Sequence, residues 1–294
     1  MPVDNSIDVL NLTQNFQPYG PGNMDVITSS VFNGGEVNIR IAGTVSRRVL
    51  ITLRANSSDD IMKLLMATDA IKTLARKNNT VPNINVFMPY LPYARQDYET
   101  KSGEALAIKV FADLINSQNY SSVRIFDCHS DVGPAVINNC ININNHEFVR
   151  GVLADKTNYV IVSPDSGAFK KVQKLCDAIG YKDTPVLCNK VRTGNGTIAK
   201  TVVSENDFCG KDVYIIDDIC DGGRTFISLA EELRKRNVGK VYLIVSHGIF
   251  SHGIDPIERG GIAGVFTTDS FRVIEDRYVT YTKLRCDDLG AWHV

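Results

Sequence analysis

The stretch VYIIDDICDGGRTF, residues 213–226, decides the fold that we expect for this chain. Valine, tyrosine and two isoleucines favour a buried strand, and they run directly into Asp217 and Asp218. A third acid, Asp221, follows with two glycines and a threonine before a helical pattern begins. In open parallel sheets, ligands bind beyond the carboxyl ends of the strands, where loops lead into helices. The stretch therefore predicts an α/β fold with a ligand site at this strand–helix turn.

The residue types in this turn suit a phosphorylated sugar. Gly222 and Gly223 let backbone N–H groups approach an anion, and Thr225 begins the following helix, whose amino end favours phosphate. Asp217 and Asp218 would repel phosphate, but carboxylates accept hydrogen bonds from sugar hydroxyls or bind a divalent metal. Together these groups describe a site for ribose 5-phosphate. The alternative is a strand end with solvated acids and a tight turn.

Composition limits the class of protein. The 294 residues are enough for one large domain or two of ordinary size, and 44% hydrophobic with 22% charged residues is typical of globular proteins. The formal net charge is -1, so the composition lacks the excess of basic residues that is typical of nucleic-acid-binding proteins. The seven cysteines form no CxxC pair, which argues against a disulfide framework or zinc knuckle and fits a reducing compartment. No signal peptide or membrane-length apolar run is recognisable, so we expect a cytoplasmic protein without membrane or nucleic-acid partners.

Short β-branched runs alternate with helical patterns along the chain. The runs are continuously apolar, as expected of parallel strands covered on both faces, and apolar residues recur at helical spacing between several of them. This alternation predicts βαβ units and a doubly wound sheet. The expected strands cover residues 49–55, 83–90, 123–129, 159–165, 212–218 and 240–247, and the expected helices cover 59–77, 168–180 and 225–239.

The order of strands, helices and polar loops occurs twice. Each half has a strand and helix, then a strand that ends in a polar loop, then a second helix and strand. We therefore expect two domains of similar fold, residues 1–145 and 146–294, with the ribose 5-phosphate loop in the second. The polar segment at 142–156 marks the boundary.

Several stretches carry a family resemblance. IIDDICDGGRT (215–225) is similar to the phosphoribosyl-binding signature of type I phosphoribosyltransferase folds. Four further stretches, in family order within residues 28–272, resemble those of the ribose-phosphate diphosphokinases, also called phosphoribosyl pyrophosphate synthetases. These stretches are MPYLPYARQDYETKSGEALAIKVFADLI (88–115), VRIFDCHS (123–130), IVSPDSGAFKKV (161–172) and VSHGIFS (245–251).

The resemblance implies a fold, a reaction and partners. The fold would be two phosphoribosyltransferase type I domains, each a mostly parallel sheet flanked by helices. The reaction would transfer the β,γ-diphosphoryl group of ATP to the 1-hydroxyl of ribose 5-phosphate with Mg²⁺ present. The resemblance also implies a homo-oligomer built from dimers, such as a hexamer. Within the phosphoribosyl signature, it implies that the sugar phosphate is bound by Asp217, Asp218, Asp221, Gly222, Gly223 and Thr225.

The same resemblance implies metal-binding and catalytic residues. His129 and Asp165 match the positions that hold the metal–triphosphate, and both side chains can coordinate or orient a hydrated Mg²⁺. Lys190 and Arg192 match a Lys-x-Arg pair that begins the mobile catalytic loop, where two cations could stabilise the transferring phosphoryl oxygens. The alternatives are a packed, hydrogen-bonded histidine and a solvated basic face of a hairpin.

ATP contacts are implied at two further places. Arg95 and Gln96 would contact the phosphates or adenine, because arginine offers a planar fork of donors. Phe32 and Glu36 resemble the segment that receives adenine from a neighbouring subunit, with an aromatic for stacking and an acid for the exocyclic amine. The alternatives are a salt-bridged surface arginine and a plain hairpin turn.

Some positions depart from the family pattern. Tyr98 and Glu99 stand where basic residues are common, which removes positive charge near the nucleotide. Arg224 replaces a small residue before the threonine of the phosphate loop, where it could add a cation or point outward. The carboxyl end is shorter than expected, so allosteric control is not carried over.

The sequence leaves competing functions open. A phosphoribosyltransferase of nucleotide salvage shares the DDxxDGG loop. It would not need a first domain that carries the motifs ARQDYETKSGE and DCHS. A catalytically silent homologue that regulates synthetase subunits is a second alternative, against which the presence of His129, Asp165, Lys190 and Arg192 argues. A ligand-sensing repressor would need a basic module, which the balanced charge disfavours.

Overall fold

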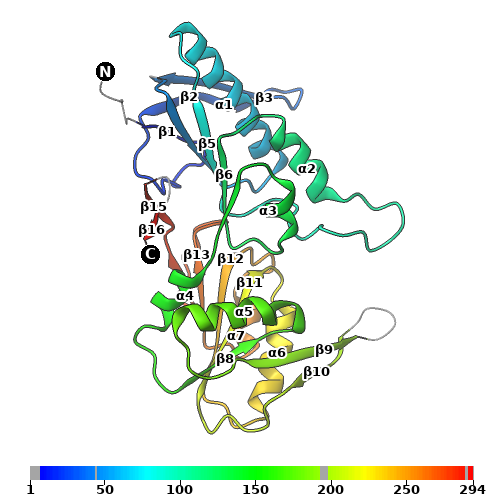
Figure 1. The fold of residues 1–294 in the computed structure, drawn as a ribbon. Helices are drawn as coiled ribbons and strands as arrows, with labels where there is room; N and C mark the ends of the chain where they lie inside the picture. The colour runs from blue at the N-terminus through cyan, green and yellow to red at the C-terminus, as the bar shows by residue number, and fades with distance from the viewer. Residues whose placement is uncertain (1–6, 44, 193–197, 289–290, 294) are drawn as a thin grey trace. The chain divides into compact units, whose positions relative to one another are not determined.

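The chain is an α/β protein with two compact units. The computed structural model describes residues 7–43, 45–192, 198–288 and 291–293 (Figure 1). The first unit contains Met1–Asn144 together with Arg285–His293, and the second contains Asn145–Leu284. The units thus divide one residue before the expected 145/146 boundary, and the segment 285–293 groups with the first unit, not with the second as expected. No helix in the described ranges combines the length and apolar character needed to cross a membrane.

The first unit is built on a five-stranded parallel sheet with the order β1-β4-β5-β6-β7. A separate hairpin, β2–β3, packs on the long helix α1. Helix α1 begins where the Ser57 side chain accepts a hydrogen bond from the backbone N–H of Asp60, as expected of a serine N-cap. The elements are β1 (Ile7–Asn11), β2 (Met24–Val31), β3 (Val37–Gly43), β4 (Arg48–Thr52), α1 (Ser58–Lys77), β5 (Asn83–Phe87), α2 (Ala107–Asn116), β6 (Ser122–Phe126), α3 (Val132–Val136) and β7 (Cys140–Ile143).

The second unit is built on a seven-stranded sheet with the order β10-β9-β8-β11-β12-β13-β14. All neighbouring strands are parallel except β10, which pairs with β9 as an antiparallel hairpin. The elements are α4 (His146–Leu153), β8 (Tyr159–Ser163), α5 (Ser166–Ile179), β9 (Val186–Arg192), β10 (Ile198–Val203), β11 (Asp212–Cys220), α6 (Arg224–Arg234), β12 (Val241–Gly248), α7 (Asp255–Arg259), β13 (Gly264–Thr268) and β14 (Val279–Thr282). A short hairpin, β15 (Arg285–Asp288) and β16 (Ala291–His293), follows.

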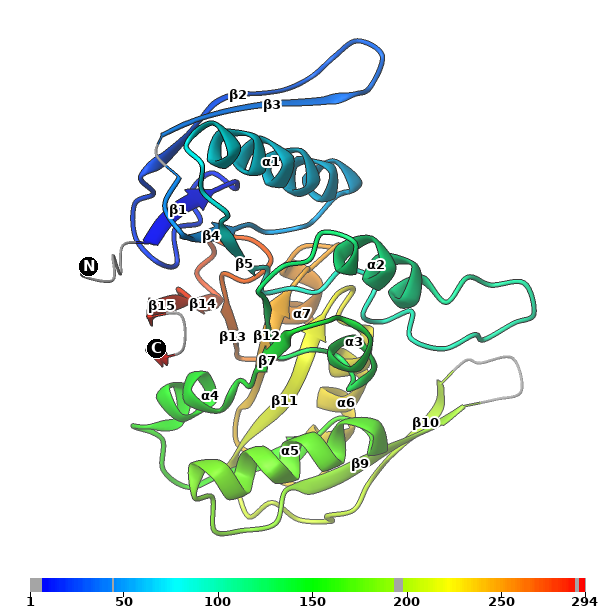
Figure 2. The same ribbon diagram turned by 45° about the horizontal axis from the view of Figure 1, so that its top comes forward.

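Both faces of the central strand β11 are covered. Val213 and Ile215 belong to the hydrophobic cluster that includes Leu229 and Leu233 of α6. Tyr214 lies on the opposite face and is also buried. Figure 2 shows α5 in front of this sheet and α6 behind it. Because side chains alternate along a strand, coverage on both sides explains why the strand reads as a continuous apolar run.

The predicted fold class is confirmed, and each expected strand and helix is present with changed ends. The strands expected at 49–55 and 83–90 end earlier, at Thr52 and Phe87. The buried residues that follow, Leu53 and Met88, each donate one more backbone hydrogen bond to the neighbouring strand, to the carbonyls of Phe87 and Arg124. Strand β11, in contrast, continues past the two aspartates to Cys220, because it keeps pairing with β12. The sequence therefore predicted the positions of the strands and helices more accurately than the residues at which they end.

Candidate functional site

The carboxyl end of β11 lies at the point in the sheet where the strand order reverses, between β8 and β11. Strand β8 leads through α5 to β9 on one side, whereas β11 leads through α6 to β12 on the other. The pairing of β11 with β8 ends at Ile215, while its pairing with β12 continues to Cys220. Asp217 and Asp218 therefore lie beyond the last pairing with β8. Such a switch point is the usual ligand site of an open α/β sheet.

Two aspartates occupy this switch point with their carboxylates held by the backbone. Asp217 Oδ1 accepts a hydrogen bond from the Asp218 N–H at 2.9 Å, and Asp218 Oδ1 accepts one from the Ile219 N–H at 2.8 Å. Asp218 is only 6% exposed. Burial, and then the adjacent charges of Asp218 and Asp165, raise the pKa of Asp217 well above its ordinary value. A ligand that donates hydrogen bonds, or a cation, would relieve this accumulation of negative charge.

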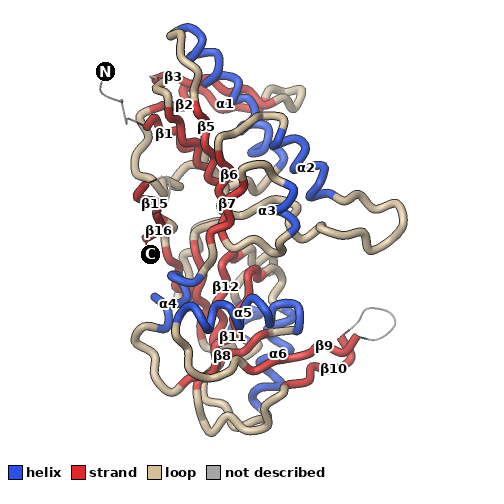
Figure 3. The backbone as a smooth tube through the Cα atoms, viewed as in Figure 1, coloured by secondary structure: helices blue, strands red, loops and turns tan. Residues whose placement is uncertain are grey.

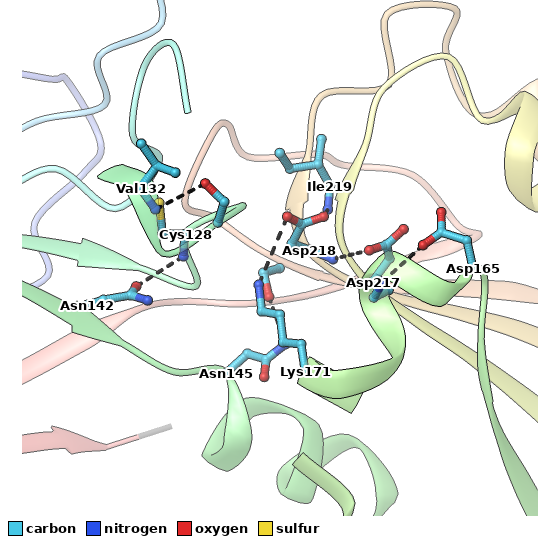
Figure 4. A network of polar contacts seen from close by, with 12 residues as sticks. Cys128, Val132, Asn142, Asn145, Asp165, Lys171, Asp217, Asp218 and Ile219 are labelled. Atoms are coloured by element: carbon cyan, nitrogen blue, oxygen red, sulfur yellow. Dashed lines mark hydrogen bonds and ion pairs between the residues drawn. The ribbon is translucent and has the colours of Figure 1, made fainter. Parts of the chain in front are cut away.

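Helix α5 brings two more charged groups to the aspartates. Asp165 is its N-cap, and Asp165 Oδ1 accepts a hydrogen bond from the Ala168 N–H at 3.0 Å. Lys171 lies on the same helix, with its Nζ 4.0 Å from Asp218 Oδ2 (Figure 4). The sequence prediction missed Lys171. No local signal distinguishes it from Lys170, because both are lysines in the polar part of a helical pattern.

The glycine loop joins β11 to the amino end of α6. Gly223 is the N-cap of α6 with φ of +76°, and its carbonyl accepts hydrogen bonds from the N–H groups of Phe226 and Ile227 at 3.0 Å each. A methyl group on Gly223 would lie 2.9 Å from Ile257 Cγ1, so the loop requires glycine both for backbone conformation and for space.

The residues predicted to bind sugar phosphate lie in one continuous segment of the second unit. Asp221 and Thr225 are partly exposed, and Thr225 is in the first turn of α6. The first N–H groups of a helix have no partner within the helix and lie at the positive end of its dipole, so an amino end of this kind favours an anion. Arg224 is exposed at the first position of the helix.

His129 lies in the first unit, after strand β6. It is exposed, whereas Asp127 before it is buried and has φ of +46°. The N–H of Cys128, between them, donates to Asn142 Oδ1 at 3.0 Å (Figure 4). The proposed metal residues His129 and Asp165 thus belong to different units. Within the described ranges, no three histidine, cysteine, aspartate or glutamate side chains form a group that could hold a metal.

Arg95 and Gln96 lie in the long segment between β5 and α2, which Figure 3 draws as a loop. Both are exposed, and the segment is held by local hydrogen bonds, including one from the Ile108 N–H to the Gln96 carbonyl at 3.3 Å. Farther along, the Glu104 carboxylate accepts from the N–H groups of Thr100 at 2.9 Å and Lys101 at 3.2 Å. Bonds from Thr100 are the main cause of a lowered pKa at Glu104.

Phe32 and Glu36 form the tip of the β2–β3 hairpin. The Phe32 N–H donates to the Glu36 carbonyl at 2.9 Å, and the Gly35 N–H donates to the Phe32 carbonyl at 2.8 Å. The segment is therefore a hairpin turn, which was the alternative to an adenine-binding segment in the sequence analysis. It leaves the Phe32 side chain 57% exposed, so this geometry is also compatible with stacking on a ligand.

Lys190 and Arg192 lie on strand β9, which pairs with β10. The two residues are two positions apart on this strand. Their side chains, and the loop residues 193–197 with Gly194 and Gly196, lie outside the described part of the chain.

The fold and this site define a two-unit α/β protein with a phosphoribosyltransferase-type loop, and comparisons with known proteins agree. Residues 22–118 match the N-terminal domain of ribose phosphate pyrophosphokinase, and residues 135–259 match the phosphoribosyl transferase domain. The chain belongs to the ribose-phosphate pyrophosphokinase family.

Individual relatives are distant but cover most of the chain. The ribose-phosphate pyrophosphokinase of Mycoplasma pneumoniae is 29% identical over 78% of this chain and 69% of its own length. That of Helicobacter hepaticus is 28% identical over 83% and 78%. The crystal structure of phosphoribosylpyrophosphate synthetase from Mycobacterium smegmatis superposes with a TM-score of 0.79 at 20% identity, covering 94% of each chain. This structural likeness supports the fold.

Proposed function

We propose that this protein transfers the β,γ-diphosphoryl group of ATP to the 1-hydroxyl of ribose 5-phosphate, with 5-phosphoribosyl 1-diphosphate and AMP as products. The main support is the carboxyl end of β11, where two hydrogen-bonded aspartates run directly into a glycine loop and the amino end of α6. A sugar that carries hydroxyls at one end and phosphate at the other matches this order of acceptors and donors.

The sugar phosphate would be oriented by charge. Asp217 and Asp218 accept hydrogen bonds from the ring hydroxyls, while N–H groups of residues 222–225 donate to the 5-phosphate. Asp221 completes the acidic side of the loop. Lys171, with its Nζ 4.0 Å from Asp218 Oδ2, offsets part of the negative charge at the two aspartates.

In the transfer step, the sugar O1 attacks the β-phosphorus of ATP. The bond between O1 and the β-phosphorus forms, the bond between that phosphorus and the oxygen bridging to the α-phosphate breaks, AMP leaves, and the O1 proton passes to solvent. Lys190 and Arg192 of β9 would stabilise the charge that grows on the phosphoryl oxygens. Arg95 and Gln96 would bind ATP, with Phe32 and Glu36 of a neighbouring subunit contacting the adenine.

Mg²⁺ is the cofactor that fits these donors. Magnesium in such enzymes is usually held by one or two carboxylates, water and substrate phosphates, and not by a complete protein cage. The carboxylate of Asp165 and the imidazole of His129 would orient the hydrated metal–ATP complex. When bound, Mg²⁺ neutralises charge on the phosphates. We further propose that the protein acts as a homo-oligomer in the cytoplasm, as the family resemblance implies.

One assay separates the proposed reaction from its alternatives. Purified protein is incubated with ATP, Mg²⁺ and ribose 5-phosphate, and AMP and ADP are separated by chromatography. AMP that forms only when the sugar phosphate is present supports the proposal. Formation of ADP instead, or of no product, argues against it. In the absence of product, a silent regulatory homologue should still bind synthetase subunits, and a salvage enzyme should consume 5-phosphoribosyl 1-diphosphate when given a nucleobase.

A further inference from the structure

The turn that follows β12, residues 249–254, is fixed against the end of β11. The N–H groups of Ile249 and Phe250 both donate to the Cys220 carbonyl, at 2.9 and 3.1 Å. Arg272 Nη2 donates to the Phe250 carbonyl at 3.0 Å, and the Gly253 N–H donates to the same carbonyl at 2.9 Å. These bonds hold the turn beside the glycine loop that follows β11.

This turn places an exposed histidine on the glycine loop. A methyl group built on Gly222 would lie 3.1 Å from His252 Cδ2 and 3.3 Å from His252 Nε2. The imidazole therefore lies in tight contact with the position of a Cβ at residue 222, and a side chain there would require the ring to shift by a few tenths of an ångström. Because His252 is exposed, its ring can reach a bound ligand as well as the backbone of the loop.

We propose that His252 is a phosphate-binding residue, whose ring N–H donates a hydrogen bond to a terminal phosphate oxygen of the sugar phosphate. This inference rests on the proposed function, because it takes the anion at residues 222–225 to be the 5-phosphate. An imidazole has at least one N–H in either of its protonation states, so it can serve as this donor in both. Backbone N–H groups and the α6 terminus approach the phosphate from the loop, and His252 adds a side-chain donor from a different strand connection.

The physical reason for such a donor is the negative charge around the loop. Asp217, Asp218 and Asp221 precede the glycines directly, so a phosphate seated at the loop is close to acidic groups. An additional donor strengthens phosphate binding without contacting the reacting O1 atom. His252 should therefore affect the binding of ribose 5-phosphate and leave the transfer step itself unchanged.

Three substitutions separate ligand binding from packing. His252→Phe keeps an aromatic ring against Gly222 but has no donor, His252→Gln keeps an N–H donor but loses the ring, and His252→Ala loses both. Binding of ribose 5-phosphate is measured by isothermal titration calorimetry, and binding of a non-hydrolysable ATP analogue is the control. Thermal unfolding of each variant shows whether the fold is intact.

We expect His252→Phe and His252→Ala to bind ribose 5-phosphate about tenfold more weakly, the loss expected for one hydrogen bond to a charged group. His252→Gln should bind within about threefold of the parent protein, since a neutral donor replaces part of the interaction. All three should bind the ATP analogue normally and keep the parent kcat at saturating sugar phosphate.

Parent-like affinity in His252→Phe, or equal losses in His252→Phe and His252→Gln, would overturn the inference. If the parent protein binds ribose 5-phosphate and forms AMP in those cases, the proposed function stands. If the parent protein does neither, the proposed function fails and the assignment of His252 fails with it.

Discussion

Replacement of Gly223 by alanine should destabilise the protein through two separable effects. The first is conformational, because Gly223 has φ of +76°, and the left-handed region costs an L-residue about 1–2 kcal/mol. The second is steric, because the new methyl group would lie 2.9 Å from Ile257 Cγ1 and 3.2 Å from its Cδ1. Ile257 is 1% exposed and has little room to move, so overpacking adds about 1–3 kcal/mol. The expected loss of unfolding free energy is the sum, about 2–5 kcal/mol.

Gly180 provides a matched control for the conformational effect. It caps α5 with the same φ of +76°, and nothing lies within 4 Å of a methyl group placed on it. Gly180→Ala should therefore cost only the conformational part, about 1–2 kcal/mol. It should also leave ribose 5-phosphate binding unchanged, whereas Gly223→Ala should weaken that binding by displacing the phosphate loop.

Chemical denaturation of the parent and the two variants, with calorimetric binding of ribose 5-phosphate, measures these effects. Adding Ile257→Ala to Gly223→Ala should recover the steric part, so the double mutant should lose about 1–3 kcal/mol less than the sum of its single mutants. Equal destabilisation by Gly180→Ala and Gly223→Ala, together with additive losses in the double mutant, would refute the proposed contact between Gly223 and Ile257.

Further predictions address the carboxylates, the catalytic loop, the metal and the first unit. The raised pKa of Asp217 means that the folded state binds a proton more tightly than the unfolded state, so stability falls as pH rises from the ordinary aspartate range through the raised pKa. Asp217→Asn should thus stabilise the protein by about 0.5–2 kcal/mol at pH 7.5 and by less at pH 4.5, as measured by chemical denaturation at each pH. An equal gain in stability at both pH values would contradict a raised pKa of Asp217 as the cause. Lys190→Ala should lower kcat by about 10²-fold with the fold intact by circular dichroism, and an unchanged kcat would remove Lys190 from the mechanism. EDTA should abolish AMP formation and excess Mg²⁺ should restore it, whereas turnover that persists in EDTA would exclude a required metal. Tyr120→Phe should cost about 1 kcal/mol in urea denaturation, because it removes the buried 2.8 Å hydrogen bond to Thr68; no loss would show that this bond contributes nothing net.

Sequence patterns predicted the elements that bury apolar residues at regular spacing. Strand β11 was expected because its apolar run is continuous, and α5 because of its apolar stripe and the terminating Gly180. The hairpin β2–β3 was not predicted as strands. Several of its apolar residues, such as Ile27 and Val31, are about half exposed, so its sequence has no clear alternation of buried and solvated positions. Strand β7 and helix α4 are too short for a periodicity to be recognised.

The amino-acid sequence alone was enough to predict the order of strand, turn and helix at residues 212–234. It was also enough to identify residues 217–225 as the segment whose acids and glycines would face a ligand. These features depend on neighbours within one or two turns of chain, where local propensity and periodicity act. Only the tertiary structure selected Lys171 over Lys170 as the partner of Asp218, placed His252 on Gly222, and grouped the segment 285–293 with the first unit. Each of these contacts joins residues at least about thirty positions apart, and packing of the whole sheet, rather than any local preference, brings such residues together.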